Sequence, residues 1–218
     1  SLFVAAITVF FGGFSQKGPA EFAAHMAVTY AMYSFLSSQI TDGCSVFQSA
    51  KTWVSSMPLP RSVHVLKSVA RGIFVFAISF IVAMVILIAT GHVPGETALL
   101  AVAAFLVILV NGVFAQTYLG YLAARYRDLD HLMSSITRLL FFVTPILWVR
   151  SEQPVGSLRR TLADINPLTH ALEIFTAPMM GRVPDINSWY VILGLTLFNF
   201  AMMLIVSWFG YRRLAYWI

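Results

Sequence analysis

The order of apolar and polar residues along the chain predicts an all-α protein that crosses a membrane several times. Long apolar segments alternate with short stretches rich in Gly and Pro, which interrupt helices. A bilayer core of roughly 30 Å needs about 20 apolar residues per helical span, and the apolar segments account for six spans. The predicted spans are Leu2–Phe14, Phe22–Ile40, Val63–Thr90, Thr97–Ala123, Leu132–Val149 and Trp189–Tyr211.

The six spans are expected to form one transmembrane domain over residues 1–218, because the sequence shows no internal repeat and no room for a second, soluble domain. The first segment starts at Ser1 inside an apolar run, with neither Met nor a basic stretch before it, unlike a signal peptide. We therefore expect the start of the first span to be missing from this sequence.

Composition supports an integral membrane protein. Of the 218 residues, 59% are hydrophobic and 11% are charged, and the mean hydropathy is +0.80, whereas a soluble domain carries about 25% charged residues. The net charge of +5 arises in short loops between apolar runs, which orients a membrane protein and argues against a nucleic-acid partner. Cys44 is the only cysteine, so the sequence has no disulfide framework and no zinc-binding spacing.

The distribution of Lys and Arg predicts that both termini are cytoplasmic. In this orientation nine basic residues are cytoplasmic and five are outside, in agreement with the positive-inside rule. Four of the five outer residues fall in one long loop, 150–188. The cytoplasmic set is Lys51, Arg61, Lys67, Arg71, Arg125, Arg127, Arg138, Arg212 and Arg213, and the outer set is Lys17, Arg150, Arg159, Arg160 and Arg182.

The polar stretch after the second span, residues 41–62, predicts a short amphipathic helix. Its apolar residues recur at helical spacing, Thr41 or Asp42 can cap its start, and Pro58 and Pro60 end it. Such a helix can lie in the membrane interface or dock into a groove on a cytoplasmic partner, and both interpretations stay open. The apolar face consists of Val46, Ala50, Trp53, Val54 and Met57.

A second polar segment, residues 125–130, precedes the fifth span and reads Arg-Tyr-Arg-Asp-Leu-Asp. It is either a solvated turn that satisfies the positive-inside rule or a contact surface for a partner. The segment is too short to decide between these interpretations.

The outer loop 150–188 is too long to be a simple connection between packed helices. It predicts two short helices, Ser157–Asp164 and Pro167–Pro178, the second with Asn166 as its N-cap and proline in its first turn. The apolar run Leu168–Met180 is too short to span a bilayer, so we expect a re-entrant or interfacial hairpin on the outer side. This hairpin either gates a pathway or only packs against the other helices.

Aromatic and hydroxyl side chains form stripes along three of the predicted spans. Aromatic rows usually face lipid or pack in a core, but they also stack on sugar rings, which suits a carbohydrate path. The stripes comprise Phe3, Ile7, Phe10 and Phe14 in the first span, Tyr30 and Tyr33 in the second, and Thr137, Phe141, Thr144 and Trp148 in the fifth.

No predicted span carries Asp, Glu or Lys near its middle, although ion-coupled carriers hold an ionisable group there. The strongly polar groups in the middle of the spans are Asn111, Gln116 and Asn199. The sequence also lacks a phosphate-binding GxxxxGK[S/T] motif. We therefore expect the energy source to lie on a separate, ATP-hydrolysing chain.

Five short pieces stand in order along the chain: Pro58-Leu59-Pro60-Arg61, Arg125–Leu129, Thr144–Trp148, Asn166-Pro167-Leu168 and Arg212–Ile218. Together they resemble the ABC-2 type membrane subunits that export O-antigen, teichoic acid and capsule polysaccharides, and the resemblance covers essentially the whole chain. The Arg-Tyr-Arg-Asp piece and the C-terminal Tyr-Trp-Ile resemble the O-antigen branch most. The sequence departs from the family in lacking an N-terminal cytoplasmic helix and in its Ser-rich segment 41–57.

The resemblance implies an all-α, six-helix ABC-2 (type V ABC exporter) transmembrane domain with an outer re-entrant helical hairpin. It further implies a homodimer of this chain with two copies of a nucleotide-binding ATPase, which would hold the ATP and Mg; this chain would bind no cofactor and catalyse no reaction. Residues 41–60 would be the coupling helix. The contacts with the ATPase would be Phe47, Lys51, Trp53, Met57, Pro60, Arg61, Arg125, Arg127 and Asp128.

By the same resemblance, the substrate is a polysaccharide linked to polyprenyl diphosphate, moved out across the bacterial inner membrane. Membrane lipids surround the subunit. The pathway would be lined by Phe3, Phe10, Phe14, Tyr30, Tyr33, Phe141, Thr144 and Trp148, and the outer gate would include Asn166, Pro167, His170 and Glu173.

Three alternatives stay open. An ABC-2 exporter of drugs, lipids or haem would not depend on the aromatic residues. A membrane-embedded transferase would use His170 and Glu173, which lie one turn apart. A scaffold subunit would have no pathway at all.

Overall fold

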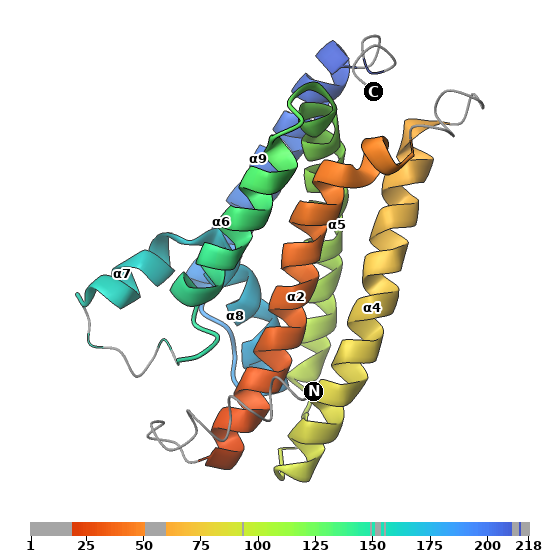
Figure 1. The fold of residues 1–218 in the computed structure, drawn as a ribbon. Helices are drawn as coiled ribbons and strands as arrows, with labels where there is room; N and C mark the ends of the chain where they lie inside the picture. Colours follow the sequence, from red (N-terminus) through yellow and green to blue (C-terminus); the bar gives the residue numbers. More distant parts are fainter. Residues whose placement is uncertain are drawn as a thin grey trace.

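The structure is a computed structural model that describes residues 19–50, 60–92, 94–148, 150, 154, 156–210 and 214. Every regular element in these ranges is a helix (Figure 1). The first predicted span, residues 2–14, lies outside the described residues. The helices are α2 (Pro19–Ser49), α4 (Arg61–Ala89), α5 (Ala98–Arg125), α6 (Leu129–Val143), α7 (Leu158–Ile165), α8 (Pro167–Met179) and α9 (Ile186–Gly210).

Three of the helices in the described ranges, α4, α5 and α9, are long and apolar enough to cross a membrane. They correspond to the third, fourth and sixth predicted spans. Large apolar side chains on them face outward, among them Phe74, Ile81 and Trp208, as expected for helices surrounded by lipid or by other membrane helices. The second predicted span lies within α2, and α6, a helix of 15 residues, covers only the first part of the fifth. The expected total of six spans stays a prediction.

Helix α2 lies beside α4, α5 and α6, and α5 in turn packs against α9 (Figure 1). The main core fills the space between α2, α4, α5 and α8 with rings and aliphatic side chains, including Phe35, Phe76 and Phe175. On the other side of α5, the Asn199 amide donates to Asn111 Oδ1 at 2.9 Å, and Asn111 Nδ2 donates to Thr196 Oγ1 at 2.8 Å. The polar groups near the middle of α5 and α9 thus bond to each other, which fastens the two helices together.

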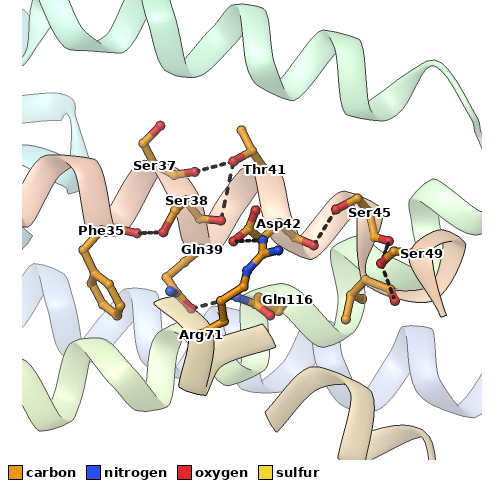
Figure 2. Close-up of polar contacts among 11 residues, drawn as sticks. Phe35, Ser37, Ser38, Gln39, Thr41, Asp42, Ser45, Ser49, Arg71 and Gln116 are labelled. Atoms are coloured by element: carbon orange, nitrogen blue, oxygen red, sulfur yellow. Dashed lines mark hydrogen bonds and ion pairs between the residues drawn. The ribbon is translucent and has the colours of Figure 1, made fainter. Parts of the chain in front are cut away.

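Residues 41–49 continue α2 and do not begin a separate helix, which differs from the predicted start at Thr41 or Asp42. The hydroxyls of Thr41, Ser45 and Ser49 donate to carbonyls three or four residues earlier in α2 (Figure 2). Such bonds compete with the helical ladder and bend helices without breaking them. The C-terminal end of α2 indeed turns away from the axis of its first part (Figure 1). Residues 51–59 of the predicted coupling helix lie outside the described residues.

The two short helices expected in the loop 150–188 are present as α7 and α8, within one residue of the predicted starts and ends. Ser157 caps α7 by accepting from Arg160 N, and Asn166 caps α8 by accepting from Leu168 N at 3.0 Å. Helix α8 is buried along most of its length against α2, α5 and α9. It is therefore an integral part of the bundle, and its depth in a membrane stays a prediction.

The bundle has two ends with separate sets of basic residues. The α5–α6 end is formed by the turn Tyr126–Asp128 with the end of α2 and the start of α4, and the α7–α8 end lies opposite (Figure 1). The described residues expected on the cytoplasmic side gather at the α5–α6 end, except Arg138 within α6. The four described basic residues that are expected outside lie in or beside α7 and α8. The bundle thus has the charge segregation on which the topology prediction was based.

Candidate functional site

A groove of about 430 Å³ runs between α2 and α6. It combines aromatic rings, hydroxyl groups and one guanidinium. We call it the α2–α6 groove. Its lining residues are Tyr30, Tyr33, Ser34 and Ser37 from α2 and Thr137, Arg138, Phe141 and Phe142 from α6.

Helical periodicity places these side chains on facing surfaces. On α2 they recur at intervals of three and four residues, and on α6 Thr137 and Phe141 are one turn apart. The Phe141 ring meets both tyrosines edge-on, with centroids 6.4 Å from Tyr30 and 5.5 Å from Tyr33. These are favourable aromatic geometries, so the rings form one connected wall.

One hydrogen bond fixes the two helices at the groove. The hydroxyl of Tyr33, which is buried, donates to the backbone carbonyl of Thr137. The Thr137 hydroxyl donates to its own helix, to Met133 O at 2.9 Å. Ser34 and Arg138 are exposed at the rim, where they can bond to a ligand. The groove therefore offers ring faces for stacking and polar groups for hydrogen bonds.

The structure brings together three of the eight predicted pathway residues, Tyr30, Tyr33 and Phe141. Thr144 is not in the groove: it is buried just past α6, donates to Leu140 O at 2.6 Å and accepts from Asn166 Nδ2 at 3.0 Å. Trp148 follows four residues later and is half-buried. Phe3, Phe10 and Phe14 lie outside the described residues.

The predicted gate residues occupy the start of α8. Asn166 links the start of α8 to the segment just after α6, because it caps α8 and donates to the Thr144 hydroxyl. Pro167 starts α8. Both ring nitrogens of buried His170 are engaged, Nδ1 with Ser188 Oγ at 3.0 Å and Nε2 with Asp164 O at 2.9 Å. His170 is 3% exposed and Ser188 is fully buried, so neither side chain is open to a substrate, which weighs against the transferase alternative. Glu173 lines a separate cavity.

Two predicted ATPase contacts are engaged inside the bundle. Phe47 is 1% exposed and packs on the Tyr121 ring at 5.0 Å, because Gly120 leaves room for it. The Arg61 guanidinium lies 5.9 Å from the centre of the same Tyr121 ring. The Phe47 side chain is thus part of the core between α2 and α5, and the amphipathic pattern did not reveal this because it ignores the neighbouring helices.

The remaining predicted contacts are exposed or outside the described residues. Arg125, Arg127 and Asp128 are exposed at the α5–α6 turn, and Arg125 lies over the Tyr126 ring at 5.2 Å. Pro60 is exposed immediately before α4. Lys51, Trp53 and Met57 lie outside the described residues.

A polar contact between α2, α4 and α5 escaped the sequence analysis. Gln116 Nε2 donates to Gln39 Oε1 at 2.8 Å, and Arg71 pairs with Asp42 at 2.9 Å (Figure 2). Gln116 stood out as a polar residue within a span, but nothing in the sequence identified Gln39 as its partner. In the part of the chain that the structure describes, no three His, Cys, Asp or Glu residues come close enough to hold a metal ion.

Comparison with known proteins gives a consistent result. Residues 1–180 match the family model of the ABC-2 type transporter. The O-antigen export system permease protein RfbA of Myxococcus xanthus is 24% identical over 166 residues, which cover 76% of this chain. The chain spans only 64% of the length of that relative.

Proposed function

We propose that this chain, which belongs to the ABC-2 type transporter family, is the permease subunit of an ATP-driven exporter of polysaccharide linked to polyprenyl diphosphate. The observation that carries the substrate class is the α2–α6 groove. The similarity of the chain to an O-antigen export permease supports the same substrate class. The resemblance found in the sequence is confirmed at the level of the family.

The groove supports a sugar pathway through the kinds of groups that line it. Pyranose rings present C–H faces that stack on aromatic rings, and hydroxyls that bond to groups such as Ser34, Ser37 and Arg138. A polymer must also slide, which requires many weak contacts and no tight, enclosed site. An open groove with ring walls and a polar rim fits this requirement.

In this proposal two copies of the chain pair with two copies of an ATPase, which binds the ATP and Mg. The contact would include residues 51–59 and the exposed α5–α6 turn with Arg127 and Asp128. This end would face the bacterial cytoplasm, with both termini there. The α7–α8 end would face outward from the inner membrane and carry the gate.

The experiment is purification of the tagged protein from its own membranes in mild detergent, followed by mass analysis and an ATPase assay. We expect an ATP-hydrolysing partner in equal amount. Arg127→Glu should lower its recovery, because the charge reversal disturbs the contact, whereas Arg159→Glu makes the same charge change at the α7–α8 end and should not. A chain that purifies alone, without ATPase activity, would contradict the proposal.

A further inference from the structure

A second cavity, of about 180 Å³, lies at the α7–α8 end among α2, α7, α8 and the segments flanking them. His25 and Thr29 of α2 line this cavity, while Tyr33 and Ser37 line the α2–α6 groove. These residues follow one another at intervals of four, or about 6 Å along the helix. The cavity, which we call the polar pocket, therefore lies beyond the groove along neighbouring surfaces of α2.

The polar pocket has a buried surface of hydroxyl groups. Thr29, Thr169 and Thr176 all line it, and each is at most 3% exposed. The Thr29 hydroxyl donates to Thr176 Oγ1 at 3.4 Å, which joins α2 to α8 across the pocket. Hydroxyls both donate and accept, so this surface can bond to a ligand of either kind.

The hydroxyl of Thr169 lacks a hydrogen-bond partner among the described residues. Thr169 is 1% exposed, so its Oγ1 is also shielded from solvent. Elsewhere in the described helices, threonines such as Thr117 and Thr196 donate to the carbonyl four residues earlier. Thr169 lies in the first turn of α8, so the residue four positions earlier belongs to α7. A buried hydroxyl without a partner is costly, and the pocket is where such a partner can bind.

The walls of the pocket carry charges of both signs. Arg150, Arg160 and Arg182 line it together with the carboxylates of Glu173 and Asp185. One Arg150 terminal nitrogen pairs with Asp164 at 2.6 Å, while its buried Nε makes no hydrogen bond to the described residues. A phosphate or a metal ion would meet charges of both signs here, so the lining does not select strongly for either kind of ion. A neutral group with several hydroxyls can instead donate to the carboxylates and accept from the guanidiniums.

We infer that the polar pocket binds a single sugar residue of a glycan through its hydroxyl groups. The cavity is smaller than the roughly 300 Å³ at which pockets for drug-sized ligands begin, which suits one sugar and not an oligosaccharide. The inference rests on the proposed function, in which the groove carries the polymer and the pocket receives a sugar at the outer end. It adds a defined binding site to that pathway.

The test measures binding of methyl glycosides of the gluco, manno, galacto and 6-deoxy series to the protein purified from its own membranes, by saturation-transfer NMR. We expect at least one glycoside to bind. Thr169→Val should weaken it by roughly fivefold, the loss expected from one neutral hydrogen bond, and Glu173→Gln should weaken it as well. Thr161→Val is the matched control, because Thr161 is exposed on α7 and outside the pocket.

Thr169→Val should fold, since it removes a buried hydroxyl that has no partner among the described residues; its thermal unfolding temperature should equal or exceed that of the parent. The inference is overturned if no glycoside in the four series binds, or if Thr169→Val binds as the parent does. It is also overturned if inorganic phosphate displaces the glycoside, which would indicate an anion site. Copurification of the ATPase tests the proposed function separately. An active complex that binds no glycoside would contradict only the sugar site in the polar pocket. Glycoside binding by a chain that copurifies with no ATPase would contradict only the exporter function.

Discussion

The closest packing in the described chain surrounds the buried amides of Gln39 and Gln116. Three glycines on three helices leave the space for them: a Cβ at Gly72 or Gly112 would lie 2.5 or 2.9 Å from the Gln39 amide, and one at Gly43 would lie 2.9 Å from the Gln116 Cα. The amides share one hydrogen bond, and Gln39 Nε2 and Gln116 Oε1 have no further partner in the part of the chain that the structure describes. Each glutamine therefore depends on the other for its polar contact.

Replacing one glutamine by Leu should destabilise the protein more than replacing both. Gln116→Leu leaves the Gln39 amide buried without a partner, at a cost of about 1–3 kcal/mol, and Gln39→Leu does the same to Gln116. The double variant removes both polar groups, so its stability should lie closer to that of the parent. Thermal unfolding in detergent measures this coupling. A double variant with the summed loss of the single variants would show that the two amides act independently.

Gly43→Ala should lower the free energy of unfolding by about 1–3 kcal/mol, because the new methyl group meets the Gln116 backbone and cannot be relieved by a side-chain rotation. Gly194→Ala is the matched control, since a Cβ at Gly194 has nothing within 4 Å. The control should leave stability unchanged or raise it slightly, as Ala favours helices over Gly. Equal losses in both variants would argue against close packing at Gly43.

At the scale of the elements, the pattern of hydrophobic residues predicted those helices that are determined by their own residues and not by distant packing partners. It located α4, α5 and α9 from apolar length, and α7 and α8 as two short helices, the second from its Asn166 cap. It failed at the end of α2, where Thr41 or Asp42 was predicted to cap the start of a new helix. In the structure the hydroxyls of Thr41 and Ser45 bond back within α2, so these residues bend the helix instead of capping another.

The candidate site was predictable only in part, for a related reason. The family resemblance implied that Tyr30, Tyr33 and Phe141 line one pathway, and the structure brings these three rings together. The burial of Phe47 depends on Gly120, seventy-three positions later in the sequence, and the bond between Gln39 and Gln116 joins residues 77 positions apart. Without the fold, a single sequence does not show which polar or aromatic residues meet.

Phe141→Ala tests whether the α2–α6 groove is part of the export pathway. Removing the ring takes away the contact with both tyrosines and should slow export by roughly two- to tenfold, as one aromatic contact is worth about 0.5–1.5 kcal/mol. Basal ATP hydrolysis should change less, because the groove lies away from the α5–α6 turn. Cell-surface polysaccharide and ATP hydrolysis provide the two measurements. Phe74→Ala is the control, since Phe74 is exposed on α4. An equal loss of export in this variant would indicate that Phe141 contributes only to packing.

At the scale of the whole molecule, the distribution of basic residues predicts that the α5–α6 end of the bundle faces the cytoplasm, and single-cysteine labelling tests this orientation. Cys44 is the only cysteine and is buried, so Cys44→Ser provides a background without reactive thiols. A cysteine at Val183, 75% exposed at the α7–α8 end, should react with an impermeant maleimide on spheroplasts. A cysteine at Tyr126, 55% exposed at the α5–α6 turn, should react only after the inner membrane is opened. The reverse pattern would place the α5–α6 end outside, where no ATPase could reach it, and would remove both the positive-inside argument and the proposed coupling surface.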